Sequence, residues 1–124
     1  MSKPTLCVIV PVYKAAATLD RCVASVLAQQ VTGGLHCILV DDGSPDESGT
    51  LCDAWAAKDD RVTVIHQDDL GVSGARNSGL AAADSEFIVF LDSSFLYIYK
   101  KYLLSKIAFL CCFLLYRNRI ISSV

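Results

Sequence analysis

The stretch Leu39-Val40-Asp41-Asp42-Gly43-Ser44 constrains the fold most, because an apolar segment ends there in two consecutive carboxylates. The apolar part has the composition of a strand buried on both faces, which is typical of parallel sheets. The carboxylates then lie at the edge where open parallel sheets bind ligands. Burying them is costly unless a helix N-terminus, a ligand's donors or a cation offsets the charge. Ordinary helix capping by Asp and Ser explains the same residues equally well.

Four short apolar runs alternate with segments of helical character. The strands that we expect are 6–12, 36–40, 62–65 and 87–91. Their alternation with helices requires right-handed crossovers, so we predict an α/β fold: a Rossmann-like three-layer α/β/α arrangement with a mainly parallel sheet. Pro11 has no N–H to donate, so we expect the first strand to stop pairing there.

Capping signals predict where the first two helices begin and end. An apolar stripe from Leu19 predicts a helix that starts near Thr18 and is ended by Gly33-Gly34. The segment Ser44-Pro45-Asp46-Glu47 predicts the second start, with serine as the cap, proline in the first turn and glutamate completing a capping box.

A third helix is expected from Gly71 to about Ala83, and its first half has unusually small residues, GVSGARNSG. Small side chains at a helix start let backbone N–H groups approach an anion, and Arg76 adds a bidentate donor. Close packing of the helix on the sheet through glycine and alanine is an equally good interpretation.

Polar residues follow each of the four predicted strands. They are Tyr13, the pair Asp41 and Asp42, the segment 66–69 and Asp92. Because parallel strands bring their carboxyl ends to one edge of a sheet, we expect these residues to converge on a binding crevice.

The charge distribution divides the chain near residue 94. Residues 1–94 contain all 13 acidic residues and six of the 11 basic ones, whereas 95–124 contain the other five basic residues and no acid. The acidic part has no basic patch, which argues against a nucleic acid as partner. The six cysteines show no zinc-type spacing, and no signal peptide precedes the first strand. We therefore expect a cytoplasmic location with reduced, buried thiols.

Three segments together resemble the start of a family 2 glycosyltransferase with the GT-A fold. They read VIVPVYKAAATLDRCVASVLAQ, ILVDDGSPDESGTLCDAWA and VTVIHQDDLGVSGARNSGLAAADSEFIVFLDS. The resemblance covers residues 5–93 and implies that 1–94 form the nucleotide-sugar-binding half of a GT-A domain, interrupted and followed by an unrelated tail.

The family transfers a sugar from a nucleotide-diphosphate donor to an acceptor hydroxyl, usually with Mg²⁺ or Mn²⁺. The resemblance implies that Pro11, Val12 and Tyr13 line the base and ribose pocket. It implies that Asp42 accepts a hydrogen bond from the base, with Asp41 beside it. It places Arg76 near the diphosphate and Asp92 near the cation.

The sequence departs from the family pattern at two places. The family has Asp-x-Asp after the fourth strand, whereas this chain has Asp92-Ser93-Ser94. A serine hydroxyl is a poor ligand for a hard cation, so only a weak site at Asp92 is expected. Residues 95–124 contain no carboxylate to deprotonate the acceptor, so we assign no catalytic residue and expect an inactive chain. The alternative function is a non-catalytic nucleotide-binding remnant or a membrane-associated fragment.

Residues 95–124 form an atypical basic, apolar tail. Its longest apolar run, 107–116, is shorter than the ~20 residues that a bilayer span requires. A basic, aromatic interfacial helix would make weak contact with a membrane surface, peripheral to the inner face. A disrupted reading frame is the favoured alternative, because the change of composition falls inside a motif that should continue.

Overall fold

The computed structural model describes residues 3–93. Within this range the elements are, in chain order, β1 (Leu6–Val12), α1 (Leu19–Leu27), β2 (Leu35–Asp42), α2 (Ser48–Lys58), β3 (Val62–Gln67), α3 (Gly71–Ala82) and β4 (Phe87–Phe90). The strands pair in parallel in the order β3-β2-β1-β4. The predicted α/β architecture with a parallel sheet is confirmed.

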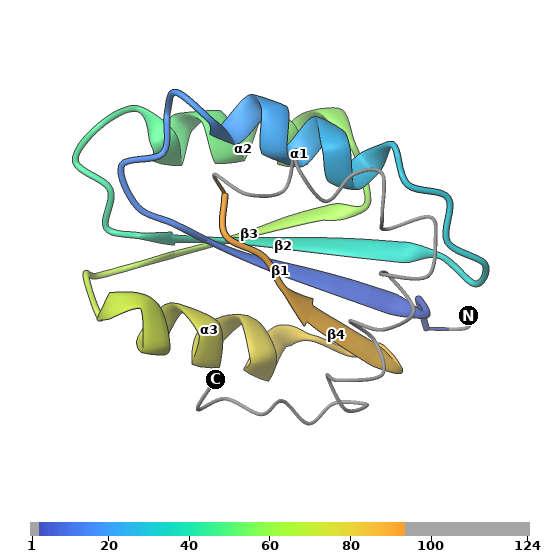
Figure 1. Cartoon of the computed structure of the whole chain (residues 1–124). Helices are drawn as coiled ribbons and strands as arrows, with labels where there is room; N and C mark the ends of the chain where they lie inside the picture. Colours follow the sequence, from blue (N-terminus) through green and yellow to red (C-terminus); the bar gives the residue numbers. More distant parts are fainter. Residues whose placement is uncertain (1–2, 94–124) are drawn as a thin grey trace.

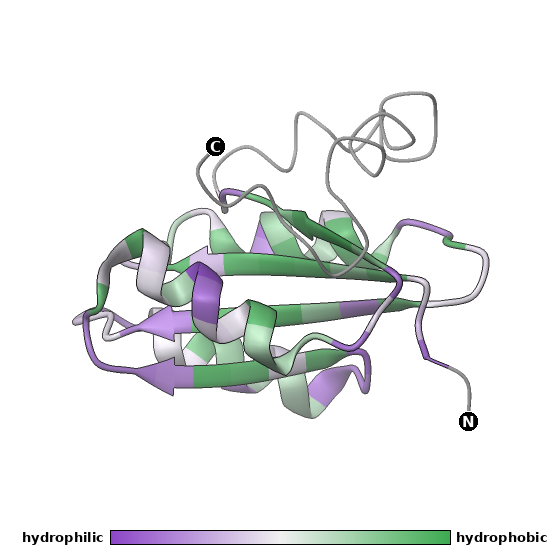
Figure 2. Cartoon of the chain, turned by 90° about the horizontal axis from the view of Figure 1, so that it is seen from below, coloured by the Kyte–Doolittle hydropathy of each residue, from purple (hydrophilic) through white to green (hydrophobic). Residues whose placement is uncertain are grey.

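Helices cover both faces of the sheet. In Figure 1, α1 and α2 lie on one face and α3 on the other. Alternate residues of β1 serve the two faces: Val8 and Val10 belong to the cluster on the α1 side, whereas Cys7 and Ile9 pack with Ala75 of α3. Because the central strands β1 and β2 are covered twice, they are apolar along most of their length, and Figure 2 shows hydrophilic residues at the carboxyl end of β2.

The order of strands reverses beside β1. The chain passes from β1 to β2 and then to β3 on one side, and α3 crosses back so that β4 lies on the other side of β1. Such a topological switch point is the usual ligand-binding position in open α/β sheets.

Pro11 lies at this switch point. The Ile9 carbonyl accepts from the Leu91 N–H at 3.0 Å, so its backbone groups face β4, and alternation along a strand turns those of Pro11 the same way. The β1–β4 ladder ends at Ile9↔Phe90, whereas the β1–β2 ladder continues to Val12. The expectation that pairing stops at Pro11 is thus confirmed toward β4 and wrong toward β2.

The first helix ends earlier than predicted. α1 stops at Leu27 rather than at Gly33-Gly34, and the Gln29 N–H bonds to the Val26 carbonyl, which tightens the last turn. The two glycines, at φ 92° and 103°, form the turn into β2 instead. The Thr5 N–H donates to both of their carbonyls, and a Cβ on Gly33 would overlap the Thr5 hydroxyl.

The second helix begins at Ser48, so the capping box predicted from Ser44 is wrong. The Ser44 Oγ instead accepts from the Lys14 N–H at 3.2 Å and donates to the Val12 carbonyl at 3.4 Å. Asp46 Oδ1 accepts from the Ser48 N–H at 3.0 Å. The Ser44 hydroxyl thus contacts the end of β1 instead of capping α2.

Candidate functional site

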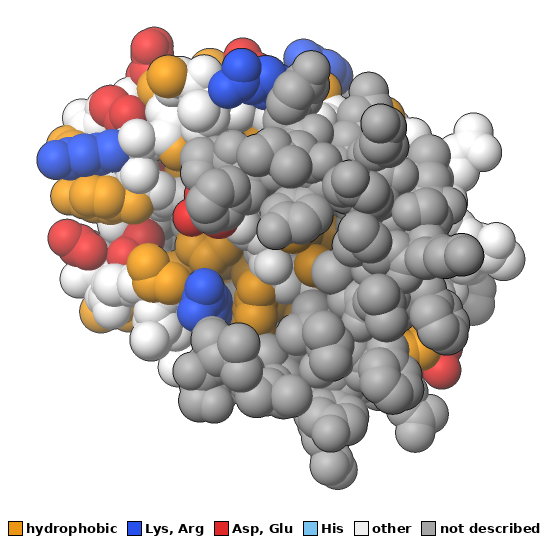
Figure 3. All heavy atoms as spheres, viewed as in Figure 1, with side chains coloured by type: hydrophobic (Ala, Val, Ile, Leu, Met, Phe, Trp, Pro, Cys, Tyr) orange, Lys and Arg blue, Asp and Glu red, His pale blue; other side chains and the backbone are white. Residues whose placement is uncertain are grey.

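A cavity of about 410 Å³ opens at the carboxyl edge of the sheet, between the end of β1, the start of α3 and the end of β4. Hydrophobic, basic and acidic side chains lie side by side over these ends on the face seen in Figure 3. Six residues that the sequence assigned to the site line the cavity: Pro11, Val12, Tyr13, Asp42, Arg76 and Asp92. Asp41 lies outside the lining.

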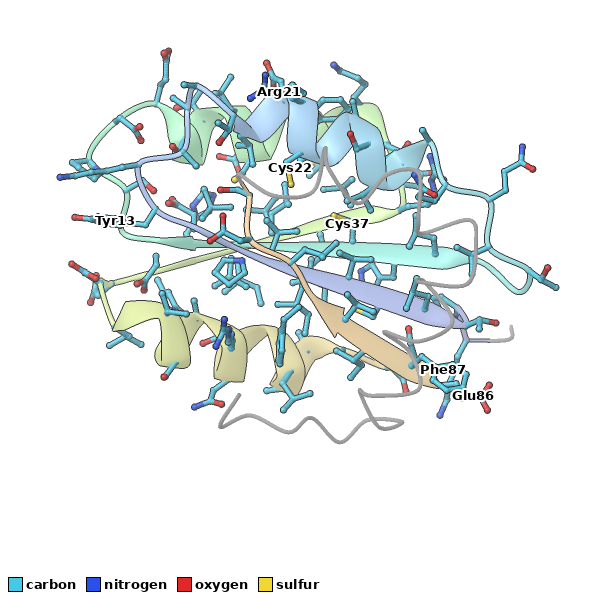
Figure 4. All side chains as sticks on the ribbon, viewed as in Figure 1. Tyr13, Arg21, Cys22, Cys37, Glu86 and Phe87 are labelled. Carbon is cyan, nitrogen blue, oxygen red and sulfur yellow. The ribbon has the colours of Figure 1, made fainter. Side chains whose placement is uncertain are left out.

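Tyr13 and Lys14 form the β1 side of the cavity. The Tyr13 side chain points outward from the end of β1 (Figure 4), and the residue is 45% exposed. The Lys14 Nζ lies 5.5 Å from the centre of the Tyr13 ring. Lys14 has a φ of 51°, a left-handed conformation that is unusual for a side chain of this type. An exposed aromatic ring at a cavity mouth can stack on a planar ligand.

Arg76 projects from α3 into the same cavity. Its guanidinium carbon lies 5.6 Å from the centre of the Phe90 ring. The Arg76 Nε is buried and has no hydrogen-bond partner within residues 3–93. An unused charged donor in a cavity is suited to an anionic ligand.

The small residues of α3 have a packing role. A Cβ on Gly79 would lie 2.5 Å from the Ile9 Cγ2, so the glycine allows the helix to approach β1 closely. The N–H groups of Leu70 and Gly71 at the helix start already donate to Asp42. These two donors therefore stabilise a protein carboxylate, and Arg76 is the charged donor that the segment offers to an anion.

Asp42 is the carboxylate that faces the cavity, and it is only 4% exposed. Its Oδ1 accepts from Gln67 Nε2 at 2.9 Å and from the Leu70 N–H at 2.8 Å, and its Oδ2 accepts from the Gly71 N–H at 2.9 Å. Burial alone would raise the pKa of Asp42, but these donors outweigh burial and hold the pKa below its ordinary value. A helix N-terminus thus offsets the buried charge, and it belongs to α3 rather than α2.

Asp41, at 6% exposed, has different partners. Its Oδ1 accepts from the Ser44 N–H at 3.1 Å, and its Oδ2 lies 2.9 Å from the Nδ1 of His66. The other ring nitrogen of His66 lies 2.7 Å from the Asp53 Oδ1 on α2. The two consecutive carboxylates therefore have separate surroundings, one at the cavity and one in a histidine bridge.

Residues 3–93 do not form a cation site on their own. They contain no group of three or more His, Cys, Asp or Glu side chains arranged to hold a metal ion. Asp92 lines the cavity, but Asp42 already accepts three N–H donors, whose positive ends disfavour a cation beside it. Ser94, at the predicted metal position, lies outside the described residues, as does the predicted tail.

The sequence did not indicate two features of this edge. Thr18, Val72 and Phe90 also line the cavity, although nothing in their type marks them as site residues. The His66–Asp53 contact was not expected either. A signal was available only for the neighbouring His66–Asp41 contact, because the two residues lie equally far from the ends of two strands that pair in parallel.

No helix of the described range is long and apolar enough to cross a membrane.

Comparisons with known proteins identify the family of the chain. The model of the family "Glycosyl transferase family 2" matches residues 7–102. Glycosyltransferase EpsJ of Bacillus subtilis, described as uncharacterized, is 40% identical over 72% of the chain, and glycosyltransferase GlyG of Streptococcus pneumoniae is 42% identical over 69%. The chain spans only 26% and 29% of these two relatives.

Solved structures show the same fold. The structure of Staphylococcus aureus TarS in complex with UDP-GlcNAc superposes with a TM-score of 0.65 at 26% identity, over 73% of this chain and 26% of that one. The mannosyltransferase PcManGT of Pyrobaculum calidifontis superposes with a TM-score of 0.67 at 24% identity, over 76% of this chain and 28% of that one. Because the family model matches most of this chain, the chain belongs to glycosyl transferase family 2.

Proposed function

We propose that the cavity binds the nucleotide of a nucleotide-diphosphate sugar, as the donor site of a family that transfers this sugar to an acceptor hydroxyl. The main observation is that an exposed aromatic ring, a buried carboxylate and a buried guanidinium nitrogen meet in one cavity, from Tyr13, Asp42 and Arg76. A nucleoside diphosphate offers a flat base, hydrogen-bond donors and an anion, which are the matching chemical groups.

Each contact has a physical basis. The Tyr13 ring stacks on the base, beside the wall formed by Pro11 and Val12. The Asp42 Oδ2 accepts the Gly71 N–H and retains acceptor capacity for a donor on the base, because a carboxylate oxygen can accept two hydrogen bonds. Arg76 donates to the diphosphate through a guanidinium suited to bidentate contact.

Relatives support this proposal. EpsJ and GlyG are named glycosyltransferases, and TarS has been crystallised with UDP-GlcNAc. The chain spans only 26–29% of these proteins, so their support concerns the donor nucleotide.

A divalent cation, Mg²⁺ or Mn²⁺, would have to rely on diphosphate oxygens in addition to Asp92. We therefore propose that these 124 residues bind the donor without Mn²⁺ dependence and do not turn it over. Replacing Ser94→Asp should add Mn²⁺-dependent tightening without producing sugar transfer, because no carboxylate in 95–124 can act as the base.

Isothermal titration of the 124-residue chain with UDP-GlcNAc, UDP and GDP tests the proposal. Arg76→Gln should weaken binding of the best of these ligands by roughly 10- to 100-fold, as expected for loss of a hydrogen bond to a charged group. Arg61→Gln is the matched control, since Arg61 pairs with Asp59 away from the cavity. Its affinity should equal that of the unaltered chain.

Three results would contradict the proposal. Absence of binding by all three nucleotides, or equal losses in the Arg76 and Arg61 variants, would refute the assigned site. Release of UDP with transfer of labelled sugar would refute inactivity of the chain. Contact of 95–124 with a membrane surface stays a prediction, which co-sedimentation of the chain with anionic liposomes tests.

A further inference from the structure

His66 bridges two carboxylates from different elements. Its Nδ1 lies 2.9 Å from the Asp41 Oδ2 on β2, and its Nε2 lies 2.7 Å from the Asp53 Oδ1 on α2. Gly49 closes one side of this bridge, since a Cβ there would lie 2.6 Å from the Asp41 Oδ2 and 3.5 Å from the His66 Cε1. The bridge therefore joins β2, β3 and α2 at the carboxyl edge of the sheet.

With both carboxylates ionised, the two distances fit a doubly protonated ring. Neutral imidazole has one N–H and one acceptor nitrogen, so it can donate to only one of two ionised carboxylates. The charged groups that face the ring are Asp53 and Asp41, and the Cys52 thiol lies close to both. Their hydrogen bonds, that of Asp53 first and that of Asp41 second, raise the pKa of His66 above 6.5.

The two ends of the bridge differ in exposure. The Asp41 side chain is 9% exposed and the Asp53 side chain is 64% exposed. When the ring loses a proton, the buried carboxylate should keep its N–H, because an unpaired buried charge is the costlier state. Deprotonation should therefore release the hydrogen bond from the ring to Asp53, so that the Asp41–His66 pair loses its link to α2.

Hydrogen bonds continue from the bridge to the cavity wall. The Asp41 Oδ1 accepts from the Ser44 N–H at 3.1 Å. The Ser44 Oγ accepts from the Lys14 N–H and donates to the Val12 carbonyl. Val12 and Lys14 both line the cavity, and Asp42 follows Asp41 directly.

We propose that His66 is a positioning residue, whose imidazolium bridge between Asp41 and Asp53 fixes the tip of β2 and, through Ser44, the β1 wall of the nucleotide cavity. The effect on ligand binding rests on the proposed function. The bridge itself does not depend on it.

Three variants, compared with the unaltered chain, distinguish the effect of the His66 bridge from the effect of removing a negative charge elsewhere. Asp53→Asn keeps a side chain whose amide can donate to the neutral ring, so the contact should survive loss of the proton. Asp53→Ala removes the contact at every pH. Asp60→Asn, an exposed change of the same charge at the far end of β3, is the control. All are compared with the unaltered 124-residue chain.

NMR titration of the His66 ring tests the bridge without any ligand. The pKa should lie above 6.5 in the unaltered chain and in Asp60→Asn, and it should fall in Asp53→Asn and Asp53→Ala. UDP-GlcNAc affinity is then measured from pH 6 to pH 8.5, because its diphosphate diester does not titrate in this range. The unaltered chain should lose about fivefold in affinity as the pH rises through the ring pKa, a modest coupling between sites.

The variants should give different pH profiles. Asp53→Asn should bind at all pH values as the unaltered chain does at pH 6, and Asp53→Ala should bind weakly throughout. A ring pKa that is unmoved by Asp53→Asn would overturn the bridge. A moved pKa with identical affinity profiles in all four proteins would overturn the positioning role. Loss of the proposed function would appear differently, as no UDP-GlcNAc binding by the unaltered chain.

Discussion

Replacing Asp42→Asn should separate the structural from the ligand-binding contribution of this carboxylate. The substitution keeps the shape of the side chain but removes its charge and replaces one acceptor oxygen with an NH₂ group. If the remaining oxygen keeps Gln67 and Leu70, the new amide faces the Gly71 N–H, which is also a donor. Asp42→Asn thus loses one hydrogen bond and weakens two.

The expected loss of stability follows from these three contacts. A hydrogen bond to a charged group contributes about 1.5–3 kcal/mol, and a neutral one about 0.5–1.5 kcal/mol. Losing one charged bond costs about 1.5–3 kcal/mol and neutralising two others about 1–1.5 kcal/mol each, so the free energy of unfolding should fall by about 3.5–6 kcal/mol. That corresponds to a Tm lower by roughly 15–45 °C for a domain of this size.

Urea denaturation at pH 7, followed by circular dichroism, measures this difference. Because the folded pKa of Asp42 lies below 3.8, its contribution is present above pH 3.8 and is lost as the pH falls through the folded value. The difference in free energy of unfolding between the unaltered chain and Asp42→Asn should therefore narrow as the pH falls below 3.8. Asp60→Asn, an exposed carboxylate, should stay within about 0.5 kcal/mol of the unaltered chain.

A result in which Asp42→Asn is as stable as Asp60→Asn at pH 7 would refute the capping role of the carboxylate. If Asp42→Asn is destabilised but binds UDP-GlcNAc normally at a temperature where it is folded, the cap is its whole role. Loss of both properties supports the double role that we propose.

Three further predictions concern packing, strain and thiols. Gly79→Ala should lower the free energy of unfolding by about 1–2 kcal/mol, because overpacking against the Ile9 Cγ2 exceeds the gain in helix propensity. The exposed change Asn77→Ala should cause no such loss. Adding Ile9→Leu to Gly79→Ala removes the Cγ2 methyl and should restore part of the lost stability. Lys14→Asn should stabilise by up to about 1 kcal/mol, since asparagine tolerates a φ of 51°, whereas Lys14→Val should destabilise, both measured by thermal unfolding. Burial raises the pKa of Cys7, Cys22 and Cys52 to about 12, and Cys37, which lies opposite Cys22 in Figure 4, is also buried. Ellman's reagent at pH 8 should therefore titrate at most two of the six thiols without denaturant. Titration of a third thiol would contradict the burial of these four cysteines.

The fold was predictable because its main signals are local. The run LCVIVPV predicts a buried strand from its own composition, and β1 has the bounds expected, 6–12. The convergence of Tyr13, Asp42 and Asp92 followed from the geometry of parallel sheets, since each lies at or just after a strand end, and Arg76 reaches the same cavity from the first half of α3.

The errors arose where distant contacts decide. Ser44 has a good capping sequence, but its hydroxyl binds Lys14 and Val12, which are distant along the chain. The sequence grouped His66 with the polar residues that follow the strand expected over 62–65, whereas the residue lies within β3. Its contact with Asp53 depends on the orientation of α2. Local periodicity determines neither how α2 is placed on the sheet nor which way a side chain at a strand end points.

The central position of β1 has a consequence for synthesis of the protein. Leu6 pairs with Phe87, so the strand made first must wait for the strand made last among the described elements. At about 5–20 residues per second, that interval on the ribosome lasts roughly 4–16 s. Until α3 and β4 emerge, the nascent chain exposes the apolar flank of Cys7, Ile9 and Ile38, which is a natural target for a chaperone.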